Sequence, residues 1–319
     1  MKTALVTGSS GYLGSHLCKY LKQSGWNVVA IDIVRPKHSY YDVFQYIDVR
    51  NHEVINYLFL KTKIDAVFHM AGRIEIGESV KDPTEFWEVN TGGTCTILNA
   101  MKKHGVKYFV YSSTAGVYKP DRINKLFDIP ISEMDNVTFD HNPYSASKLA
   151  SENAIKQSGI NYMIFRYFNL AGADEELDIG ENHEPETHLI PRIFQNLNNF
   201  ELYGDDYDTE DGSCIRDYVH VTDVAKAHIT GLEYLMGGGQ SVLMNLGTGK
   251  GHSNLEIINL IKDKLNLPVK YTVVSRRQGD PDSLVADINL AQKVLQFKPR
   301  YDIMDILQTA YDWHLRNDK

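Results

Sequence analysis

Short apolar runs alternate with stretches of helical periodicity along the first half of the chain. The apolar runs lie at residues 4–6, 28–31, 45–49, 65–70, 108–112 and 161–166, and a further run, VLMNL, lies at 242–246. Between them, residues 53–61, residues 83–104 and a segment that begins at Pro143 have the pattern of helices. Strands that alternate with helices predict a parallel sheet joined by right-handed crossovers.

The first apolar run leads into a glycine-rich turn, TGSSGYLGSH, with Gly8, Gly11 and Gly14 spaced three apart. Glycine at such positions allows a tight turn, a close approach of the backbone to a diphosphate, and close packing of helix against strand. A helix that begins at Gly11 or Tyr12 offers free N–H groups to this anion. The second run ends in Asp32, where an acid meets the ribose hydroxyls and would repel a 2′-phosphate. The turn therefore predicts dinucleotide binding, with NAD preferred over NADP.

The alternation of strands and helices loosens beyond residue 166. The later sequence has loops rich in Asp, Glu, Gly and His, although residues 222–236 resemble a helix and residues 242–246 a core strand. We therefore expect an α/β fold in which residues 1–166 form a doubly wound (Rossmann) NAD-binding domain. Residues 167–319 form a smaller, discontinuous region that mainly binds substrate, and segments near 217–250 return to the first domain.

Composition narrows the possible partners. The 319 residues have a formal net charge of −8 and a pI near 5.8, which argues against binding of nucleic acid. No apolar segment approaches the ~20 residues of a membrane span, and the first strand follows the N-terminus without an export signal. Cys18, Cys95 and Cys214 are odd in number and lack paired metal-ligand spacing, so we expect reduced thiols and no metal. These features predict a cytoplasmic protein without a membrane anchor.

Tyr144 and Lys148 are the candidates for acid–base chemistry. Four residues apart, they lie on one face of the predicted helix, although such pairs are also common on helix surfaces. A lysine ammonium and an oxidised nicotinamide together could lower the pKa of the phenol by about three units and make Tyr144 a general base. Thr114 follows the strand at 108–112, at the sheet edge where ligands bind, and is expected to hydrogen-bond the same substrate hydroxyl. The long loop at 115–143 is expected to belong to a site or an interface.

On these motifs the chain resembles the extended short-chain dehydrogenase/reductase family. The resemblance lies in TGSSGYLGSH, HMAG, VNTGGT, YSSTAGVY, NPYSASK and RYFNLAGA, of which the glycine and Tyr/Lys motifs are shared by the entire family. Further segments similar to those of its nucleotide-sugar epimerases are IGESV, GENHEPETHLIP, TEDGS with RDYVHV, NLGTG and RRQGD, and TEDGS with RDYVHV and RRQGD are far more specific. The resemblance implies a homodimer that inverts C4 of a UDP-hexose with NAD. It implies interconversion of UDP-glucose and UDP-galactose through a 4-keto intermediate.

The resemblance also implies roles for individual residues, which fall into three sets. The residues implied to contact NAD are Gly8, Gly11, Tyr12, Leu13, Gly14, Asp32, Asp48, Val49, Ala71, Gly72, Asn90, Tyr144 and Lys148. The residues implied to bind the UDP-sugar are Thr114, Tyr144, Asn169, His188, Leu189, Tyr203, Arg216, Arg277, Asp280 and Leu284. The implied catalytic residues are Thr114, Tyr144 and Lys148. Arg216 and Arg277 suit the binding of a UDP-sugar, because a guanidinium group binds a diphosphate through paired hydrogen bonds.

Three positions qualify the resemblance. Ile74 stands where many family members have a lysine near the cofactor, and His188 stands where they have an asparagine against the nucleotide. Leu284 stands where a small residue tends to admit N-acetylated hexoses. Its bulk favours UDP-glucose and UDP-galactose, because an acetamido group would be crowded against leucine.

Three alternatives stay open: an epimerase for N-acetylated UDP-hexoses, a nucleotide-sugar 4,6-dehydratase, and an NAD-sensing protein without catalysis. A dehydratase typically has Asp-Glu after the serine that corresponds to Ser113, where this chain has Thr114 and Ala115. The presence of Thr114, Tyr144 and Lys148 argues against a purely sensing role.

Overall fold

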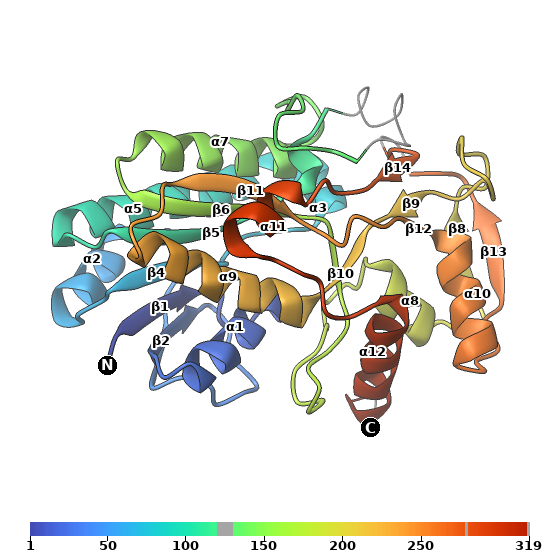
Figure 1. Cartoon of the computed structure of the whole chain (residues 1–319), viewed down its shortest axis with the longest axis horizontal. Coiled ribbons are helices and arrows are strands. Elements are labelled where there is room, and N and C mark those ends of the chain that lie inside the picture. Colours follow the sequence, from blue (N-terminus) through green and yellow to red (C-terminus); the bar gives the residue numbers. More distant parts are fainter. Residues whose placement is uncertain (120–129, 278–279, 318–319) are drawn as a thin grey trace. The chain divides into compact units, whose positions relative to one another are not determined.

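The computed structural model describes residues 1–119, 130–277 and 280–317, which form two compact units (Figure 1). Unit 1 comprises Met1–Val117, Thr138–Arg166 and Ala225–Met244. Unit 2 comprises Tyr118–Val137, Tyr167–Val224 and Asn245–Lys319. Residues 120–129 of the expected site loop and residues 278–279 of the RRQGD motif lie outside the described residues.

Unit 1 is built on a twisted sheet that has seven strands among the described residues, in the order β11-β6-β5-β4-β1-β2-β3. The strands are β1 (Thr3–Thr7), β2 (Asn27–Asp32), β3 (Val43–Tyr46), β4 (Ala66–His69), β5 (Tyr108–Thr114), β6 (Asn161–Tyr167) and β11 (Val242–Leu246). The pairs β1–β2, β2–β3, β1–β4 and β4–β5 are all parallel. The chain moves outward from β1 to β3 and then returns to the other side of β1. This order confirms the predicted doubly wound α/β fold and places a ligand crevice at the carboxyl ends of β1 and β4.

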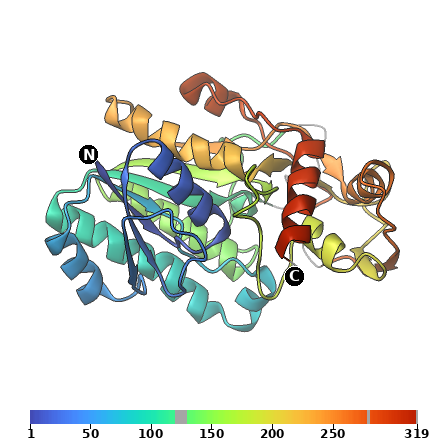
Figure 2. The ribbon, with the colours of Figure 1, turned by 90° about the horizontal axis from the view of Figure 1, so that it is seen from below.

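Helices cover both faces of this sheet (Figures 1 and 2). On one face lie α1 (Tyr12–Gln23) and α9 (Val221–Met236), where the ammonium of Lys226 lies 4.9 Å from the ring centre of Tyr20. On the other face lie α2 (His52–Lys61), α5 (Gly93–His104) and α7 (Pro143–Gln157). Ile55, Ile97 and Ile155 of these three helices share one buried core with the strands. The short helices of unit 1 are α3 (Ile76–Lys81), α4 (Pro83–Phe86), the π-helix η1 (Trp87–Gly92) and the 3₁₀ helix η2 (Ala115–Val117).

The third strand is the clearest error of the sequence analysis. The apolar run predicts a strand at residues 45–49, but β3 covers Val43–Tyr46. The reason is its partner: β2 ends at Asp32, which pairs with Tyr46, so the ladder stops there. Asp48 instead lies in the following turn, where its Oδ1 accepts the backbone N–H of Arg50 at 2.9 Å.

The two helices with a proline at the start follow the sequence prediction more closely. The helix predicted at residues 83–104 is present as α4, η1 and α5 in succession, with a π-helical turn in its middle that the periodicity did not indicate. Helix α7 begins at Pro143 as predicted. The side chain of Asn142 caps it by accepting the N–H of Ser145 at 2.8 Å.

Unit 2 consists of small sheets and short helices. Its strands are β7 (Asn169–Ala171), β8 (Phe200–Tyr203), β9 (Ile215–Arg216), β10 (Tyr218–His220), β12 (His252–Ser253), β13 (Tyr271–Val274) and β14 (Ser283–Leu284). They form the sheets β10-β7, β12-β9-β14 and β13-β8. The helices are α8 (Leu189–Gln195), α10 (Asn254–Lys264), α11 (Asn289–Leu295) and α12 (Ile303–Asn317). Ile190, Phe200, Ile257 and Ile306 share the core of this unit.

Across the three described ranges, we find no helix whose length and apolar character would suit a membrane span.

Candidate active site

The turn between β1 and α1 is shaped for an anion. Gly8 has a φ of +66°, which favours glycine, and a Cβ there would lie 2.6 Å from the backbone nitrogen of Ala71. A Cβ on Gly14 would lie 2.0 Å from the carbonyl oxygen of Gly8. Gly11 is the N-cap residue of α1, and no side chain caps the helix or adds negative charge to its first turn. The N-terminus of this twelve-residue helix therefore suits the binding of a phosphate.

Asp32 closes the other side of this turn. Its Oδ2 accepts the N–H of Ser10 at 2.9 Å, and its Oδ1 accepts the N–H of Val34 at 3.1 Å. These two bonds hold the carboxylate at the carboxyl end of β2, beside the turn. Of the neighbouring predicted residues, Leu13 is buried in α1, and the N–H of Ala71 donates to Thr7 Oγ1 at 3.1 Å. Tyr12 is the first residue of α1.

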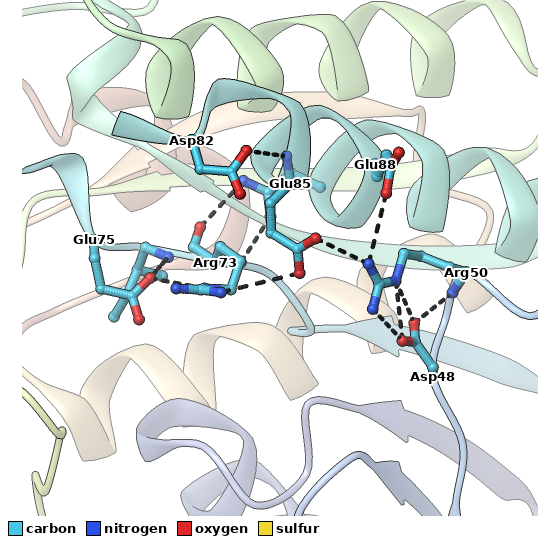
Figure 3. A network of polar contacts seen from close by, with 9 residues as sticks. Asp48, Arg50, Arg73, Glu75, Asp82, Glu85 and Glu88 are labelled. Atoms are coloured by element: carbon cyan, nitrogen blue, oxygen red, sulfur yellow. Dashed lines mark hydrogen bonds and ion pairs between the residues drawn. The ribbon is translucent and has the colours of Figure 1, made fainter. Parts of the chain in front are cut away.

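Asp48 belongs to a charged network that links the turn after β3 to α4 and η1 (Figure 3). Arg50 Nη2 lies 2.6 Å from Asp48 Oδ2, while Arg50 Nη1 lies 3.0 Å from Glu85 and 3.7 Å from Glu88. The hydrogen bonds from Arg50 hold the pKa of Asp48 below its usual range. A cofactor contact by Asp48 would have to share this carboxylate with Arg50. Val49 beside it is buried.

Asn90, in η1, joins the chain that follows β4 to helix α7. Its Oδ1 accepts the N–H of Arg73 at 2.8 Å, and its Nδ2 donates to Ser147 Oγ at 2.9 Å. Gly72 lies against this contact, because a Cβ there would be 2.8 Å from Asn90 Oδ1 and 3.2 Å from Lys148 Nζ. The structure thus brings Gly72, Asn90 and Lys148 together. Ile74, two residues beyond Gly72, is 38% exposed.

Thr114 and Tyr144 meet at the carboxyl end of β5. Burial raises the pKa of the Tyr144 phenol, a hydrogen bond with Thr114 acts in the opposite direction, and the charge of Glu75 adds to the rise. The lowered pKa that the Tyr144–Lys148 spacing suggested is therefore not produced by these side chains alone. The physical reason is burial, which disfavours the charged phenolate.

Lys148 is held by the strand that bears Thr114. Its Nζ donates to the carbonyl oxygen of Ser112 at 2.9 Å and lies 5.0 Å from the ring centre of Tyr111. Burial lowers its pKa to about 8, although Glu152 opposes that shift. Lys148 therefore stays mostly protonated at neutral pH.

Glu152 and Arg166 form a buried ion pair behind Lys148 that the sequence analysis missed. Arg166 donates to Glu152 at 2.8 Å and 2.6 Å, and Ser113 Oγ donates to Glu152 at 2.6 Å. Glu152 follows Lys148 by one helical turn on α7, which was the available signal. Its partner, at the end of β6, could be found only from the fold.

In unit 2, Arg216, Asp280 and Leu284 lie together. Arg216 Nη1 donates to the carbonyl oxygens of Ile215 and Pro281, and its Nη2 lies 3.6 Å from Asp280 Oδ1. Its side chain is only 10% exposed. Leu284 pairs with Arg216 in the parallel β14–β9 ladder and is partly exposed. A guanidinium group with fixed orientation is thus available beside Leu284.

A second group of unit 2 joins Arg277 to Tyr203. The guanidinium carbon of Arg277 lies 4.3 Å from the ring centre of Tyr203, and that of Arg192 lies 5.1 Å from the same ring. Stacking of guanidinium on an aromatic face is favourable and also suits a planar base. Asn169 is elsewhere in unit 2, in β7, where its backbone N–H donates to the carbonyl oxygen of Asp217.

His188 precedes Leu189, the first residue of α8, and faces two acids. Its Nδ1 lies 2.7 Å from Glu181 Oε1 and 3.4 Å from Glu186 Oε1. Burial disfavours the protonated imidazole, but the combined effect of the two carboxylates is larger and raises the pKa of His188 to about 10. These partners were not expected from the sequence, although the segment ENHEPETH contains His188 and both acids within eight residues.

Asp217 of RDYVHV forms hydrogen bonds with residues of NLGTG and so connects the two motifs in the folded chain. Its carboxylate accepts Thr248 N–H at 2.8 Å, Thr248 Oγ1 at 2.7 Å and Gly249 N–H at 2.9 Å. It also accepts Ala286 N–H at 3.2 Å. Burial raises the pKa of Asp217, and these hydrogen bonds act against the rise. The motif residues therefore join segments that are distant in the sequence.

The doubly wound sheet, the glycine turn and the Thr114–Tyr144–Lys148 group define a dinucleotide-dependent enzyme of the short-chain dehydrogenase/reductase class. A family profile matches residues 4–247, which is more than half of the chain. The chain belongs to the NAD dependent epimerase/dehydratase family.

Characterised relatives cover almost the whole chain. It is 41% identical to UDP-glucose 4-epimerase of Halalkalibacterium halodurans, with 97% of this chain and 95% of the relative aligned. It is 40% identical to the enzyme of the same name from Lacticaseibacillus casei, over 98% and 96% of the two chains. A crystal structure of UDP-glucose-4-epimerase from Stenotrophomonas maltophila has NAD and formylated UDP-arabinopyranose bound. It is similar with a TM-score of 0.92, 35% identity, and coverage of 100% of this chain and 99% of that one.

Proposed function

We propose that this chain inverts C4 of a UDP-hexose with NAD and interconverts UDP-glucose and UDP-galactose. Its relatives carry the name of that activity over nearly their full length. The observation that carries the proposal is the meeting of Thr114 with Tyr144 at the carboxyl end of β5, with Lys148 held on the same strand. A hydroxyl pair in that place suits the removal of a proton from a sugar hydroxyl.

The residues of unit 1 fit NAD. Side chains at Gly8 and Gly14 would clash with backbone, as expected of a turn that admits a diphosphate, and α1 offers uncapped N–H groups. Asp32 is fixed beside the turn by Ser10 and Val34, in the position expected for binding ribose hydroxyls. When bound, NAD supplies the reversible oxidation and reduction at C4 that inversion through a 4-keto sugar requires.

The contacts of Tyr144, Thr114 and Lys148 suggest a separate role for each residue in the proposed reaction. Tyr144 takes the proton of the C4 hydroxyl and returns it after the sugar has presented its other face. Thr114 orients that hydroxyl and hydrogen-bonds the phenol. Lys148, with a pKa near 8, supplies a positive charge at neutral pH. That charge and the charge of the oxidised nicotinamide favour phenolate against the effect of burial.

We assign the UDP part of the substrate to residues of unit 2. Arg216 and Arg277 are proposed to bind the diphosphate, with Tyr203, Asp280, Asn169, His188 and Leu189 as further contacts. The fixed guanidinium of Arg216 and the Arg277–Tyr203 stack support this assignment. Firm binding of UDP leaves the sugar free to turn, which is what inversion at a single carbon needs.

A simple assay tests the activity. The purified protein is incubated with UDP-galactose and no added cofactor, and UDP-glucose is measured by chromatography. Formation of UDP-glucose is expected, because the NAD is reoxidised within each cycle and needs no second substrate. The absence of UDP-glucose, both without cofactor and with added NAD, would overturn the proposal. A 4-keto-6-deoxy sugar as the main product would indicate a dehydratase instead.

We also propose that the protein is a cytoplasmic homodimer, as the family resemblance implies. Apolar side chains that are exposed in unit 1, such as Trp87 of η1 and Val80 of α3, offer surface that a second copy would cover. Light scattering after size-exclusion chromatography measures the molar mass directly. A mass of about one chain at micromolar concentration would contradict the homodimer.

A further inference from the structure

Four residues just before α8 bring two imidazoles and two carboxylates to one point. They are Glu181, His183, Glu186 and His188, and one ligand atom of each lies within 4.8 Å of the others. The carboxylate side chains are only 8% and 3% exposed, and the Nδ1 atoms of both histidines are shielded from solvent. Two carboxylates so close together and so little hydrated are stabilised by positive charge between them, which a protonated His188 or a bound cation supplies.

Three of the four nitrogen–oxygen distances within this cluster are close to the edge length of a small coordination tetrahedron, and the two histidines face different oxygens of Glu186. His183 Nδ1 lies 3.5 Å from Glu181 Oε1 and 3.4 Å from Glu186 Oε2, and His188 Nδ1 lies 3.4 Å from Glu186 Oε1. Zinc bonds of about 2.0–2.2 Å to nitrogen and oxygen give tetrahedral edges of about 3.3–3.5 Å. The remaining measured contact, His188 Nδ1 to Glu181 Oε1, is 2.7 Å and would have to open by about 0.7 Å.

The segment that bears the four side chains is fixed at both ends. At Gly180 the backbone lies so close to α12 that a Cβ would be 2.3 Å from the Trp313 ring. At the other end, Ile190 in the first turn of α8 is buried in the core of unit 2. Between them, Glu186 accepts the N–H groups of Thr187 at 2.8 Å and His188 at 2.9 Å. The side chains that would bind the ion are therefore largely oriented before any ion arrives.

We propose that Glu181, His183, Glu186 and His188 form a binding site for one divalent transition metal, with Zn²⁺ as its best-fitting ion. Two imidazole nitrogens and two carboxylate oxygens are ligands that zinc accepts, whereas Mg²⁺ and Ca²⁺ prefer oxygen alone. We expected no metal because the cysteines lack paired ligand spacing. That reasoning did not consider this set, whose proposed ligands are His and Glu residues within eight positions.

A metal in this site has a structural role. His188 is the N-cap residue of α8, so coordination would fix the start of that helix and the position of Leu189. The site shares His188 with the proposed UDP contacts, but its evidence does not involve Tyr144 or Lys148, and binding of Zn²⁺ is measured without substrate. Its failure and the failure of the proposed function are therefore separate results.

The test is calorimetric titration of tag-free, chelator-treated protein with zinc chloride. One equivalent of Zn²⁺ per chain is expected to bind, excess Mg²⁺ should not compete, and Co²⁺ in its place should show the strong visible absorption of a tetrahedral complex. The variants His183→Ala and Glu181→Gln should each weaken binding of Zn²⁺ at least tenfold. Zn²⁺ should raise the Tm of the parent protein and raise that of His183→Ala far less.

His252→Ala is the matched control. His252, in β12, also faces a glutamate, with Nδ1 2.9 Å from Oε1 of Glu256 in α10, but neither residue belongs to the cluster. Its loss should leave Zn²⁺ affinity within twofold of the parent. Binding of less than about 0.2 equivalents would overturn the proposal. So would equal affinities in His183→Ala and His252→Ala, and so would a Co²⁺ complex without tetrahedral bands.

Discussion

Arg166 donates two hydrogen bonds to Glu152, at 2.8 Å and 2.6 Å, where the two side chains are 3% and 0% exposed. Ser113 donates a third hydrogen bond to the same carboxylate. The pair joins β6 to α7, the helix that bears Tyr144 and Lys148. A buried ion pair adds little compared with apolar packing, but removal of one partner leaves a charge without compensation.

Arg166→Ala is therefore expected to lower the free energy of unfolding by about 3–5 kcal/mol, because it strands the Glu152 carboxylate. Lys156→Ala is the matched control, since Lys156 lies 3.5 Å from the same carboxylate but is 37% exposed. Its loss should cost less than about 1 kcal/mol. Urea unfolding followed by circular dichroism measures the free energy of unfolding of both variants. Equal decreases in the two variants would contradict the larger effect expected for the buried ion pair.

Tyr144→Phe removes the proposed base while it keeps the ring. Turnover of UDP-galactose should fall by about 10² to 10⁴, because general-base catalysis contributes that much. The content of bound NAD and the Tm should stay close to the parent values. Tyr57→Phe, on the exposed surface of α2, should leave the rate unchanged. An unaltered rate in Tyr144→Phe would remove this residue from the mechanism.

Lys148 is expected to make the free energy of unfolding depend on pH in the alkaline range. Its pKa of about 8 in the folded protein lies below the model-peptide value of 10.5. Between these two pH values the unfolded chain binds the additional proton, so the contribution of Lys148 to stability rises with pH there, by up to about 1.4 kcal/mol per pH unit. Lys148→Met should lose this rise.

The measurement is urea unfolding of parent, Lys148→Met and Lys156→Met from pH 7 to pH 10 at one NAD concentration. Lys156→Met removes a partly exposed lysine of the same helix. Its curve should stay parallel to that of the parent between pH 8 and pH 10, while the Lys148→Met curve should be flatter. Parallel curves for all three proteins would contradict the burial effect on Lys148.

Asp32 should decide between the two dinucleotides. Asp32→Asn keeps an acceptor for Ser10 but removes the charge that repels a 2′-phosphate. The ratio of the Kd for NADP to the Kd for NAD should fall at least tenfold, a change of about 1.4 kcal/mol. Asp42→Asn, which removes a carboxylate bound to Lys22, serves as the control and should leave the ratio unaltered. Release of NADP from denatured parent protein would refute this account.

Leu284 is expected to limit the size of the sugar. It stands next to Arg216 in the β14–β9 ladder and is only partly buried. Leu284→Ser should raise kcat/KM for UDP-N-acetylgalactosamine relative to UDP-galactose by about 10- to 200-fold, the range for small changes in a pocket. Val285→Ser, which alters the next side chain, one that lies against Gly251, should not. Equal use of both sugars by the parent protein would discard the hypothesis.

The dinucleotide half of the fold was predictable because its signals are local. Gly8 and Gly14 stand at fixed distances from a strand and a helix, and Pro143 with Asn142 starts α7 through contacts within three residues. Strand order then follows from the general rules for parallel sheets. Such features need no knowledge of distant partners.

What the sequence analysis missed depends on distant contacts. The end of β3 is decided by where β2 ends. Glu152 finds Arg166 only when β6 lies beside α7.

Asp217 also constrains the order in which the chain can fold during synthesis. Its carboxylate is buried, yet the last of its partners, the N–H of Ala286, lies 69 residues further along the chain. A carboxylate without these partners stays hydrated, because burial without hydrogen bonds is costly. On the ribosome, unit 2 therefore remains incomplete until residue 286 has left the exit tunnel. A chain that stops before Ala286 would leave the Asp217 carboxylate without one of its hydrogen bonds.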